Sequence, residues 1–270
     1  MEHPSGLSVH EHVPADRKRG DPVVVLVHGS LDRSTSFTRV LRRLTDLHTV
    51  VYDRRGYHRS RDAVPLATGI DGHVDDLLAV IGGRPAVVVG HSYGGTVALG
   101  AALRHDPPST ITSLAAYEPP LPWLPPWTGR RTRPRPVGED EDPGDAAERF
   151  FRRMVGERSW ERLPESAREA RRADGPALVA ELRAIRVDDA PFDVTALRIP
   201  SLFGRGELSV DHHREGVAWL VDRVPGAELW ELPGANHGAH LSHPDGFAAF
   251  VRRAVERSSE SVPAPVGDPA

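Results

Sequence analysis

One serine of this sequence stands where a nucleophile would stand. Ser92 lies in GHSYGG, between an apolar run, AVVVG at 86–90, and a run of small residues, GGTVALGAAL at 94–103. A serine hydroxyl attacks a carbonyl group efficiently when a base takes its proton and when N–H donors bind the oxyanion that forms. A base and two such donors must therefore be sought elsewhere in the chain.

Glycines flank Ser92 at the two positions where a side chain would obstruct a tight turn. GHSYG fits the pattern Gly-x-Ser-x-Gly, with Gly90 and Gly94 two residues before and after the serine. A sharp strand-to-helix turn strains the backbone of its central residue, and bulk at these two positions would collide. The pattern therefore predicts a turn that exposes the Ser92 hydroxyl beside the N-terminus of the following helix.

The donors for the oxyanion are expected from two backbone segments. One is the N–H group of Tyr93, which opens the helix after the turn. The other is the N–H group of Ser30, with Leu31 as a further candidate. These residues follow the apolar run VVVLVH and Gly29, and glycine permits a close approach of the backbone.

Histidines late in the chain supply the base. ELPGANHGAHLSHPDGF contains His237, His240 and His243, and His237 follows the preceding apolar run at the shortest interval, so it is the expected base. The three-residue spacing also invites interpretation as a zinc site. That spacing crosses a loop and a proline rather than one helical face, and the motif contains no carboxylate ligands. No metal is therefore expected.

Short β-branched runs alternate with longer amphipathic segments, which indicates parallel strands buried on both faces and joined by helices. Strands are expected at 23–28, 48–53, 86–90, 111–117, 199–204 and 227–232, with an antiparallel edge strand at 7–13. Helices are expected near 34–46, 72–82, 93–105, 211–224 and 244–257. The chemistry would then lie in loops at the carboxyl ends of the strands.

The alternation is interrupted once, at 119–195, where PPLPWLPPWTG and a charged, proline-rich stretch precede helical segments. An insertion at this edge of a parallel sheet is expected to form a helical cap or lid. Its aromatic side chains either pack the core of the cap or line an apolar pocket for the substrate. The pocket candidates are Trp123, Trp127, Phe150 and Met154. The core would comprise 1–118 and 196–257, with a disordered tail at 258–270.

Four motifs occur in a fixed order over nearly the whole chain outside the insertion. They are HGS, DRRGYHRS, GHSYGG and PGANHGAHLSHPDGF. Together they resemble the α/β-hydrolase superfamily. The resemblance implies an α/β fold with a mostly parallel, eight-stranded sheet flanked by helices, a helical cap, and a Ser-acid-His triad in that chain order. It also implies a serine hydrolase similar to the carboxylic-ester hydrolases.

Two glutamates compete for the acid of the triad. Most family members place the acid about three residues past a glycine that ends the strand before the last, and GRGE places Glu207 there. Some members place it at the end of the strand after the nucleophile's helix, where AAYEPP places Glu118. The YEPP ending resembles the branch that uses the earlier position, so Glu118 is preferred and Glu207 stays the alternative.

The predicted function is hydrolysis of a small, largely apolar ester, thioester or lactone through an acyl-enzyme intermediate, without a cofactor. The same triad also supports carbon-carbon bond hydrolysis or cofactor-free perhydrolysis, because fold and triad do not fix the reaction. A ligand-binding protein that has lost turnover is a further alternative. The natural substrate and the formation of a homo-oligomer are left open by the sequence.

Composition sets limits on partners and environment. The 270 residues, 39% of them hydrophobic, suffice for one large α/β domain. A net charge of -4 and a pI near 6.4 give no reason to expect a nucleic-acid or membrane partner. The absence of cysteine excludes disulfides, a thiol nucleophile and thiolate metal ligands. The polar N-terminus does not resemble a signal peptide, so a cytoplasmic protein is expected.

Overall fold

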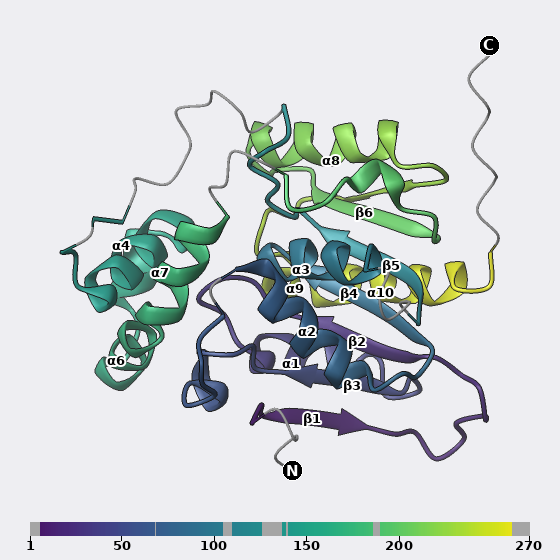
Figure 1. The fold of residues 1–270 in the computed structure, drawn as a ribbon, viewed down its shortest axis with the longest axis horizontal. Coiled ribbons are helices and arrows are strands. Elements are labelled where there is room, and N and C mark those ends of the chain that lie inside the picture. Colours follow the sequence, from purple (N-terminus) through teal and green to yellow (C-terminus); the bar gives the residue numbers. More distant parts are fainter. Residues whose placement is uncertain are drawn as a thin grey trace.

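A seven-stranded sheet forms the centre of the molecule, with the strand order β1-β3-β2-β4-β5-β6-β7 (Figure 1). The computed structural model describes residues 6–67, 69–104, 110–125, 137–138, 140–185 and 190–260. The strands are β1 (Val9–His12), β2 (Val23–Val27), β3 (Thr49–Tyr52), β4 (Ala86–His91), β5 (Ile111–Tyr117), β6 (Ser201–Gly206) and β7 (Glu228–Leu232). Neighbouring strands run parallel, except that β1 is antiparallel to β3.

The strands lie where the sequence predicts them, and their ends differ by at most two residues. The expectation of eight strands is wrong for the described residues, which form seven. The segment 13–22, VPADRKRGDP, connects β1 to β2 through turns and contributes no further strand. Its two prolines lack the N–H group that a β-ladder needs, and its charged residues favour solvent.

Burial on both faces explains why the central strands are nearly continuous apolar runs. Every residue of β2 and of β4 is buried. Val23, Val25 and Val27 pack into one core cluster, whereas Val24 and Leu26 pack into a second cluster on the opposite face. Side chains alternate along a strand, and β-branched residues fit this pleated geometry, so a valine run serves both clusters.

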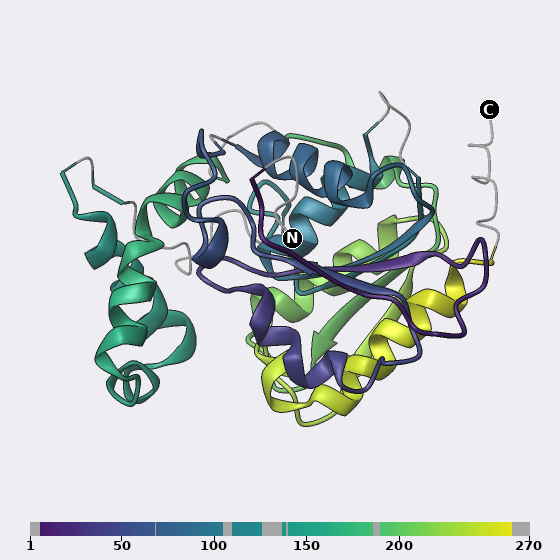
Figure 2. The same ribbon diagram turned by 90° about the horizontal axis from the view of Figure 1, so that it is seen from below.

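Helices cover both faces of the sheet (Figure 2). The first core cluster includes side chains of α2, α3 and α8, and the second includes side chains of α1, α9 and α10. Their bounds are α1 (Thr38–Leu41), α2 (Ile70–Ile81), α3 (Tyr93–Ala102), α8 (Asp211–Arg223), α9 (Ala239–Ser242) and α10 (Pro244–Arg257). Short 3-10 helices span Ser34–Phe37, His58–Ser60 and Val194–Ala196. No helix among the described residues is long and apolar enough to cross a membrane.

A helical insertion between β5 and β6 stands at one side of the sheet (Figure 1). It contains α4 (Pro143–Val155), α5 (Glu157–Glu161), α6 (Glu165–Ala173) and α7 (Gly175–Ala184). A third cluster joins Phe151 and Trp160 of the insertion to Leu31 and Tyr57 of the sheet's loops. The insertion is thus packed on the segments that follow β2 and β3. The predicted tail, 258–270, lies mostly outside the described residues.

The topology gathers several loops at one edge of the sheet. β2 lies between β3 and β4, so the order in which the chain adds strands reverses at β2. In open α/β sheets a ligand binds beyond the carboxyl ends of the strands at such a reversal. The segments after β2, β4, β5 and β7, which contain the predicted site residues, all begin at this edge.

Candidate active site

Ser92 occupies the turn between β4 and α3 in a strained backbone conformation. Its φ of 54° and ψ of -129° are a combination that residues other than glycine rarely adopt. The Ser92 N–H donates to the carbonyl oxygen of Tyr117 at 2.9 Å, and the Ser92 carbonyl accepts from the N–H of Gly95 at 2.7 Å. Both backbone groups of the strained residue are therefore held in place.

The glycines around Ser92 are required by close backbone approach. A Cβ atom on Gly90 would collide with the carbonyl oxygen of Gly94, and a Cβ on Gly94 would collide with that of Val27. A Cβ on Gly29 would lie 2.9 Å from the Cβ of Ser92. The turn is thus compatible only with glycine at these positions, and Gly29 brings the segment after β2 directly against Ser92.

The structure brings His237 and Glu118 together. The His237 Nδ1 lies 2.7 Å from Glu118 Oε2, and a bond to a carboxylate requires Nδ1 to carry the proton. The other ring nitrogen, Nε2, is then free to accept one. Glu118 is fully buried, and its Oε1 accepts hydrogen bonds from the Gly206 N–H at 2.8 Å and the Ser209 hydroxyl at 2.5 Å. These bonds fix the carboxyl group in one orientation.

The alternative acid, Glu207, has a different environment. Its side chain is exposed, and its Oε2 accepts a hydrogen bond from the Gly234 N–H at 2.8 Å. Gly234 lies at positive φ in the turn that precedes His237. Glu207 therefore braces the loop of the predicted base, whereas Glu118 contacts the base itself.

The predicted oxyanion segment is tied to the helical insertion. The Ser30 hydroxyl donates to Glu181 Oε2 of α7 at 2.7 Å, and the guanidinium of Arg171 in α6 donates to the carbonyl oxygen of Leu31. Leu31 is buried and has a φ of 53°. Tyr93, the other expected donor, is the first residue of α3 and is buried beside Ser92. The expected donor residues thus flank Ser92 from two sides.

A buried ion pair between Arg54 and Glu181 holds the predicted oxyanion segment. Arg54 and Glu181 are both buried, and the guanidinium of Arg54 binds the Glu181 carboxylate. Arg54 also donates to the carbonyl oxygens of His28 and Gly29, each at 2.9 Å. Burial raises the pKa of Glu181, but Arg54 and His73 lower it by more, so the pKa lies below its ordinary value.

His28, the first residue of the HGS motif, directly follows β2, is buried and bonds backbone groups. The Nδ1 of His28 bonds the carbonyl oxygen of Gly29 at 2.8 Å, and its Nε2 accepts from the Arg54 N–H at 2.9 Å. Burial, followed by the charge of Arg54, lowers the pKa of His28 to about 4. The ring is neutral at pH 7 and connects the segments after β2 and β3.

Backbone strain is concentrated at the predicted site. The described non-glycine residues with positive φ are Leu31, His58, Ser92 and Glu118. Three of these four are site candidates, and strained residues cluster where a particular side-chain direction is needed.

Sequence reasoning did not place several side chains beside His237, the predicted base. The ring of His213, from α8, stacks on His237 with centroids 4.4 Å apart and planes 10° apart. Burial and the adjacent His237 place the pKa of His213 well below its ordinary value. His91 and Tyr117 bind the backbone of the base's loop. The signal available in the sequence was position, since His91 and Tyr117 immediately precede Ser92 and Glu118.

The evenly spaced histidines after β7 do not converge on one point. His237 lies with His213 and Glu118, and His240 lies with His91 and Asp32. In each group the nitrogen and carboxylate atoms are within 4.8 Å of one another, a spacing that a metal ion could bridge. Both carboxylates already have protein partners, because Glu118 bonds His237 and Asp32 bonds the Ser36 hydroxyl. Among the described residues, the Nδ1 atoms of His91, His213 and His240 have no hydrogen-bond partner.

The pocket candidates have different environments. Trp123 packs against the first core cluster and makes an edge contact with Phe192, with ring centroids 5.4 Å apart. Phe150 packs against the third cluster, and Met154 on α4 is exposed. Trp127 lies outside the described residues. Lining of a substrate pocket by these side chains stays a prediction.

Comparisons with known proteins agree with the observed fold. A model of the alpha/beta hydrolase family matches residues 24–250. The uncharacterized hydrolase YraK of Bacillus subtilis is 36% identical over 123 residues, which make up 42% of this chain and 42% of the relative. The chain thus aligns with less than half the length of that relative.

Two other matches extend over nearly the whole of the related chain. The pimeloyl-(acyl-carrier protein) methyl ester esterase of Nitrosospira multiformis is 29% identical over 253 residues, covering 86% of this chain and 94% of the relative. A solved alpha/beta hydrolase from Sphaerobacter thermophilus is 26% identical with a TM-score of 0.69, covering 93% of this chain and 98% of that one. These names agree with the expectation of an enzyme similar to the carboxylic-ester hydrolases. The chain belongs to the alpha/beta hydrolase family.

Proposed function

We propose that this protein is a serine hydrolase that cleaves a small, largely apolar ester, thioester or lactone, with Ser92 as nucleophile, His237 as base and Glu118 as acid. The observation that carries the proposal is the 2.7 Å bond from His237 Nδ1 to the buried Glu118 carboxyl, at the edge of the sheet where Ser92 stands in its strained turn. In a Ser-His-acid triad, the acid holds the histidine ring in the tautomer and orientation that allow it to accept the serine proton, and this arrangement matches that requirement.

The mechanism divides the hydrolysis into two steps. His237 Nε2 accepts the Ser92 proton while the hydroxyl oxygen attacks the substrate carbonyl, and the backbone N–H groups of Tyr93 and Ser30, with Leu31 as a further donor, bind the oxyanion. His237 then gives the proton to the leaving group, and an acyl-enzyme forms on Ser92. Water, deprotonated by His237, releases the acid and restores the serine. Glu118 holds the ring in the required tautomer throughout.

The helical insertion is proposed to be the cap that covers the substrate. Its third cluster already packs against Leu31, beside the expected oxyanion donors. The apolar character of Trp123 and Phe150, and of Trp127 in the undescribed part, supports an apolar acyl group as substrate. The named relative that acts on a methyl ester supports ester cleavage within the same family.

The decisive experiment replaces the nucleophile. Ser92→Ala is expected to keep the fold and to lower turnover of p-nitrophenyl esters by about 10⁴- to 10⁶-fold, because a triad loses most of its effect with its nucleophile. The same variant should lose labelling by a fluorophosphonate probe. Ser113→Ala is the matched control, because it removes a buried serine hydroxyl that donates to the carbonyl oxygen of Pro200 at 3.2 Å.

Circular dichroism and thermal unfolding confirm that both variants are folded before their rates are compared. Ester hydrolysis that survives in Ser92→Ala, or equal losses in the two variants, would contradict the proposed mechanism. If the probe labels Ser92 but no ester, thioester or lactone is turned over, the assignment of Ser92 as nucleophile would stand. The proposed substrate class would then be wrong.

A further inference from the structure

The loop of the predicted base is held at two consecutive carbonyl groups. His91 Nε2 lies 2.7 Å from the backbone oxygen of His237, and the Tyr117 hydroxyl donates to the backbone oxygen of Asn236 at 3.1 Å. His91 immediately precedes Ser92, and Tyr117 immediately precedes Glu118. The side chains before the nucleophile and before the acid thus both bind the segment that carries the base.

The sheet places these two side chains next to each other. His91 and Tyr117 are paired in register on the adjacent parallel strands β4 and β5, so their side chains lie on the same face. Their rings are stacked, with centroids 6.1 Å apart and planes 27° apart. Both residues are buried. The rigid part of the sheet therefore fixes the two donors relative to the strained residues that follow them.

Both groups act as neutral hydrogen-bond donors. A carbonyl oxygen only accepts, so the proton of the neutral His91 ring must be on Nε2. Burial, with the nearby His240 and His237, keeps the pKa of His91 well below its ordinary value. Burial also raises the pKa of Tyr117, so its hydroxyl keeps its proton. The contribution of each side chain is a directed bond rather than a charge.

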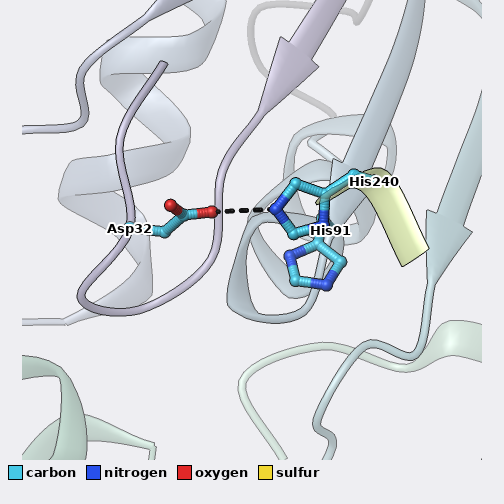
Figure 3. Close-up of side chains that lie close together, drawn as sticks. All are labelled: Asp32, His91 and His240. Atoms are coloured by element: carbon cyan, nitrogen blue, oxygen red, sulfur yellow. Dashed lines mark ion pairs between the residues drawn. The ribbon is translucent and has the colours of Figure 1, made fainter. Parts of the chain in front are cut away.

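A further pair keeps the His91 ring in place (Figure 3). The ring of His240, from α9, lies against it with centroids 4.1 Å apart. His240 Nε2 is 3.3 Å from Asp32 Oδ2, and this aspartate also accepts a hydrogen bond from the Ser36 hydroxyl at 3.0 Å. Asp32 follows the predicted oxyanion segment, so Asp32, His240 and His91 connect the segment after β2, the end of β4 and the segment after β7.

We propose that His91 and Tyr117 are positioning residues, which orient the His237 imidazole by holding the backbone of residues 236 and 237. The inference rests on the proposed function, in which His237 is the base. Neither side chain needs to contact the substrate, because each acts through the direction of the His237 ring. A displacement of about 1 Å in such a group can cost about 10²-fold in rate, far more than one hydrogen bond would suggest.

Three substitutions test the two bonds. His91→Leu removes the donor and keeps a bulky side chain, His91→Gln offers an amide N–H near the place of Nε2, and Tyr117→Phe removes only the hydroxyl. His91→Leu and Tyr117→Phe are each expected to lower kcat per titrated active site about 10-fold, with KM changed less than about 2-fold. His91→Gln should recover most of the loss. In the double variant that combines His91→Leu with Tyr117→Phe, kcat should fall by more than the product of the two single fold-losses. Neither the His237 carbonyl nor the Asn236 carbonyl is then held by a side chain.

Two control variants measure the general effect of losing a buried polar group. Tyr52→Phe removes a buried hydroxyl that has no hydrogen-bond partner among the described residues. His48→Leu removes a buried imidazole that bonds Glu11 at 2.5 Å, at the amino end of β3 and away from the site. Both controls should keep the wild-type kcat per active site, even where they change thermal stability.

An NMR measurement reads the same geometry without a substrate. With labelled histidine, the low-field proton signal of the His237–Glu118 bond should shift or broaden in His91→Leu and Tyr117→Phe, and should persist in His91→Gln and in both controls. If the wild-type protein shows no Ser92-dependent turnover, the proposed function fails, and this signal still decides the positioning role. An unchanged signal in the double variant overturns the inference, as do equal kcat values for His91→Leu, His91→Gln and the wild type.

Discussion

At the scale of single residues, strain and hydrogen bonding are combined at the same positions. A non-glycine residue at strained φ/ψ costs on the order of 1–3 kcal/mol and persists only when its surroundings fix it. Glu118, with a φ of 48°, is fixed by bonds to Gly206, Ser209 and His237. In this conformation the Glu118 carboxyl group contacts the ring of His237, the predicted base.

The competition between Glu118 and Glu207 is decided by a pair of isosteric variants. Glu118→Gln is expected to lower kcat by about 10³- to 10⁴-fold, because the amide can donate to His237 and so favours the wrong tautomer. Glu207→Gln should stay within about 5-fold of the wild type, because its carboxylate braces Gly234 in an exposed turn. Steady-state ester hydrolysis, normalised to titrated sites, measures both. A larger loss in Glu207→Gln would assign the acid to that residue.

The sequence could not choose between these glutamates, for a geometric reason. β5 and β6 are adjacent and parallel, with Tyr117 paired to Gly204, so the residues after both strands emerge at the same edge. Spacing along the chain places both carboxyl groups near the base without saying which one turns toward it. Ser92 and His237 could be predicted as candidates because local motifs mark them, whereas the bond between His237 and Glu118 joins residues 119 positions apart.

At the scale of elements, the insertion and the sheet are connected through charged side chains. Arg54, after β3, binds Glu181 on α7, and Glu181 also accepts from Ser30. Short apolar runs and helical periodicity sufficed to place the strands and helices. This connection could not be predicted in the same way, because Ser30 and Glu181 are 151 positions apart and Glu181 belongs to no local motif. The same holds for the packing of Phe151 against Leu31.

Because the Arg54–Glu181 ion pair is buried, replacing one carboxylate oxygen of Glu181 is expected to change the free energy of unfolding strongly. Glu181→Gln leaves the Arg54 guanidinium buried without a charged partner, which should lower the free energy of unfolding by about 3–5 kcal/mol. Urea denaturation followed by circular dichroism measures the change. Glu169→Gln on the neighbouring helix α6 is the control, because its side chain is exposed and its replacement should change the free energy by less than about 0.5 kcal/mol. Similar values for the two variants would show that the pair contributes little.

At the scale of the whole molecule, the core and the site share one property, the burial of neutral histidines. His28 lies beneath the oxyanion segment, His73 lies against Glu181, and His91 and His213 flank His237. Burial is the largest cause of the lowered pKa of each of these four rings. The burial of these rings beside the predicted site is therefore expected to make the fold sensitive to acid.

The expected sign of this sensitivity follows from proton binding. Below about pH 6.5 the unfolded chain protonates these histidines, whereas the folded protein keeps His28 neutral down to about pH 4. Stability is then complete above pH 6.5 and falls as the pH decreases, by about 1.4 kcal/mol per pH unit for each such histidine. Buried acids with lowered pKa values, such as Glu181, add their loss only below about pH 4.5. The ordinary pKa of histidine is about two units higher than that of glutamate. The free energy of unfolding should therefore begin to decline about two pH units above the range in which the carboxyl groups titrate.

Urea unfolding between pH 5 and pH 8 measures this decline. His213→Phe should reduce the slope below pH 6.5 by about 1.4 kcal/mol per pH unit, because it removes one group that binds a proton only in the unfolded chain. His12→Gln, which replaces an exposed histidine, controls for the loss of an imidazole elsewhere in the chain. A free energy of unfolding that is constant from pH 7 to pH 5 would show that the buried rings accept protons in the folded state. The packing around His213 would then have to tolerate a buried positive charge, which burial of its ring makes unfavourable.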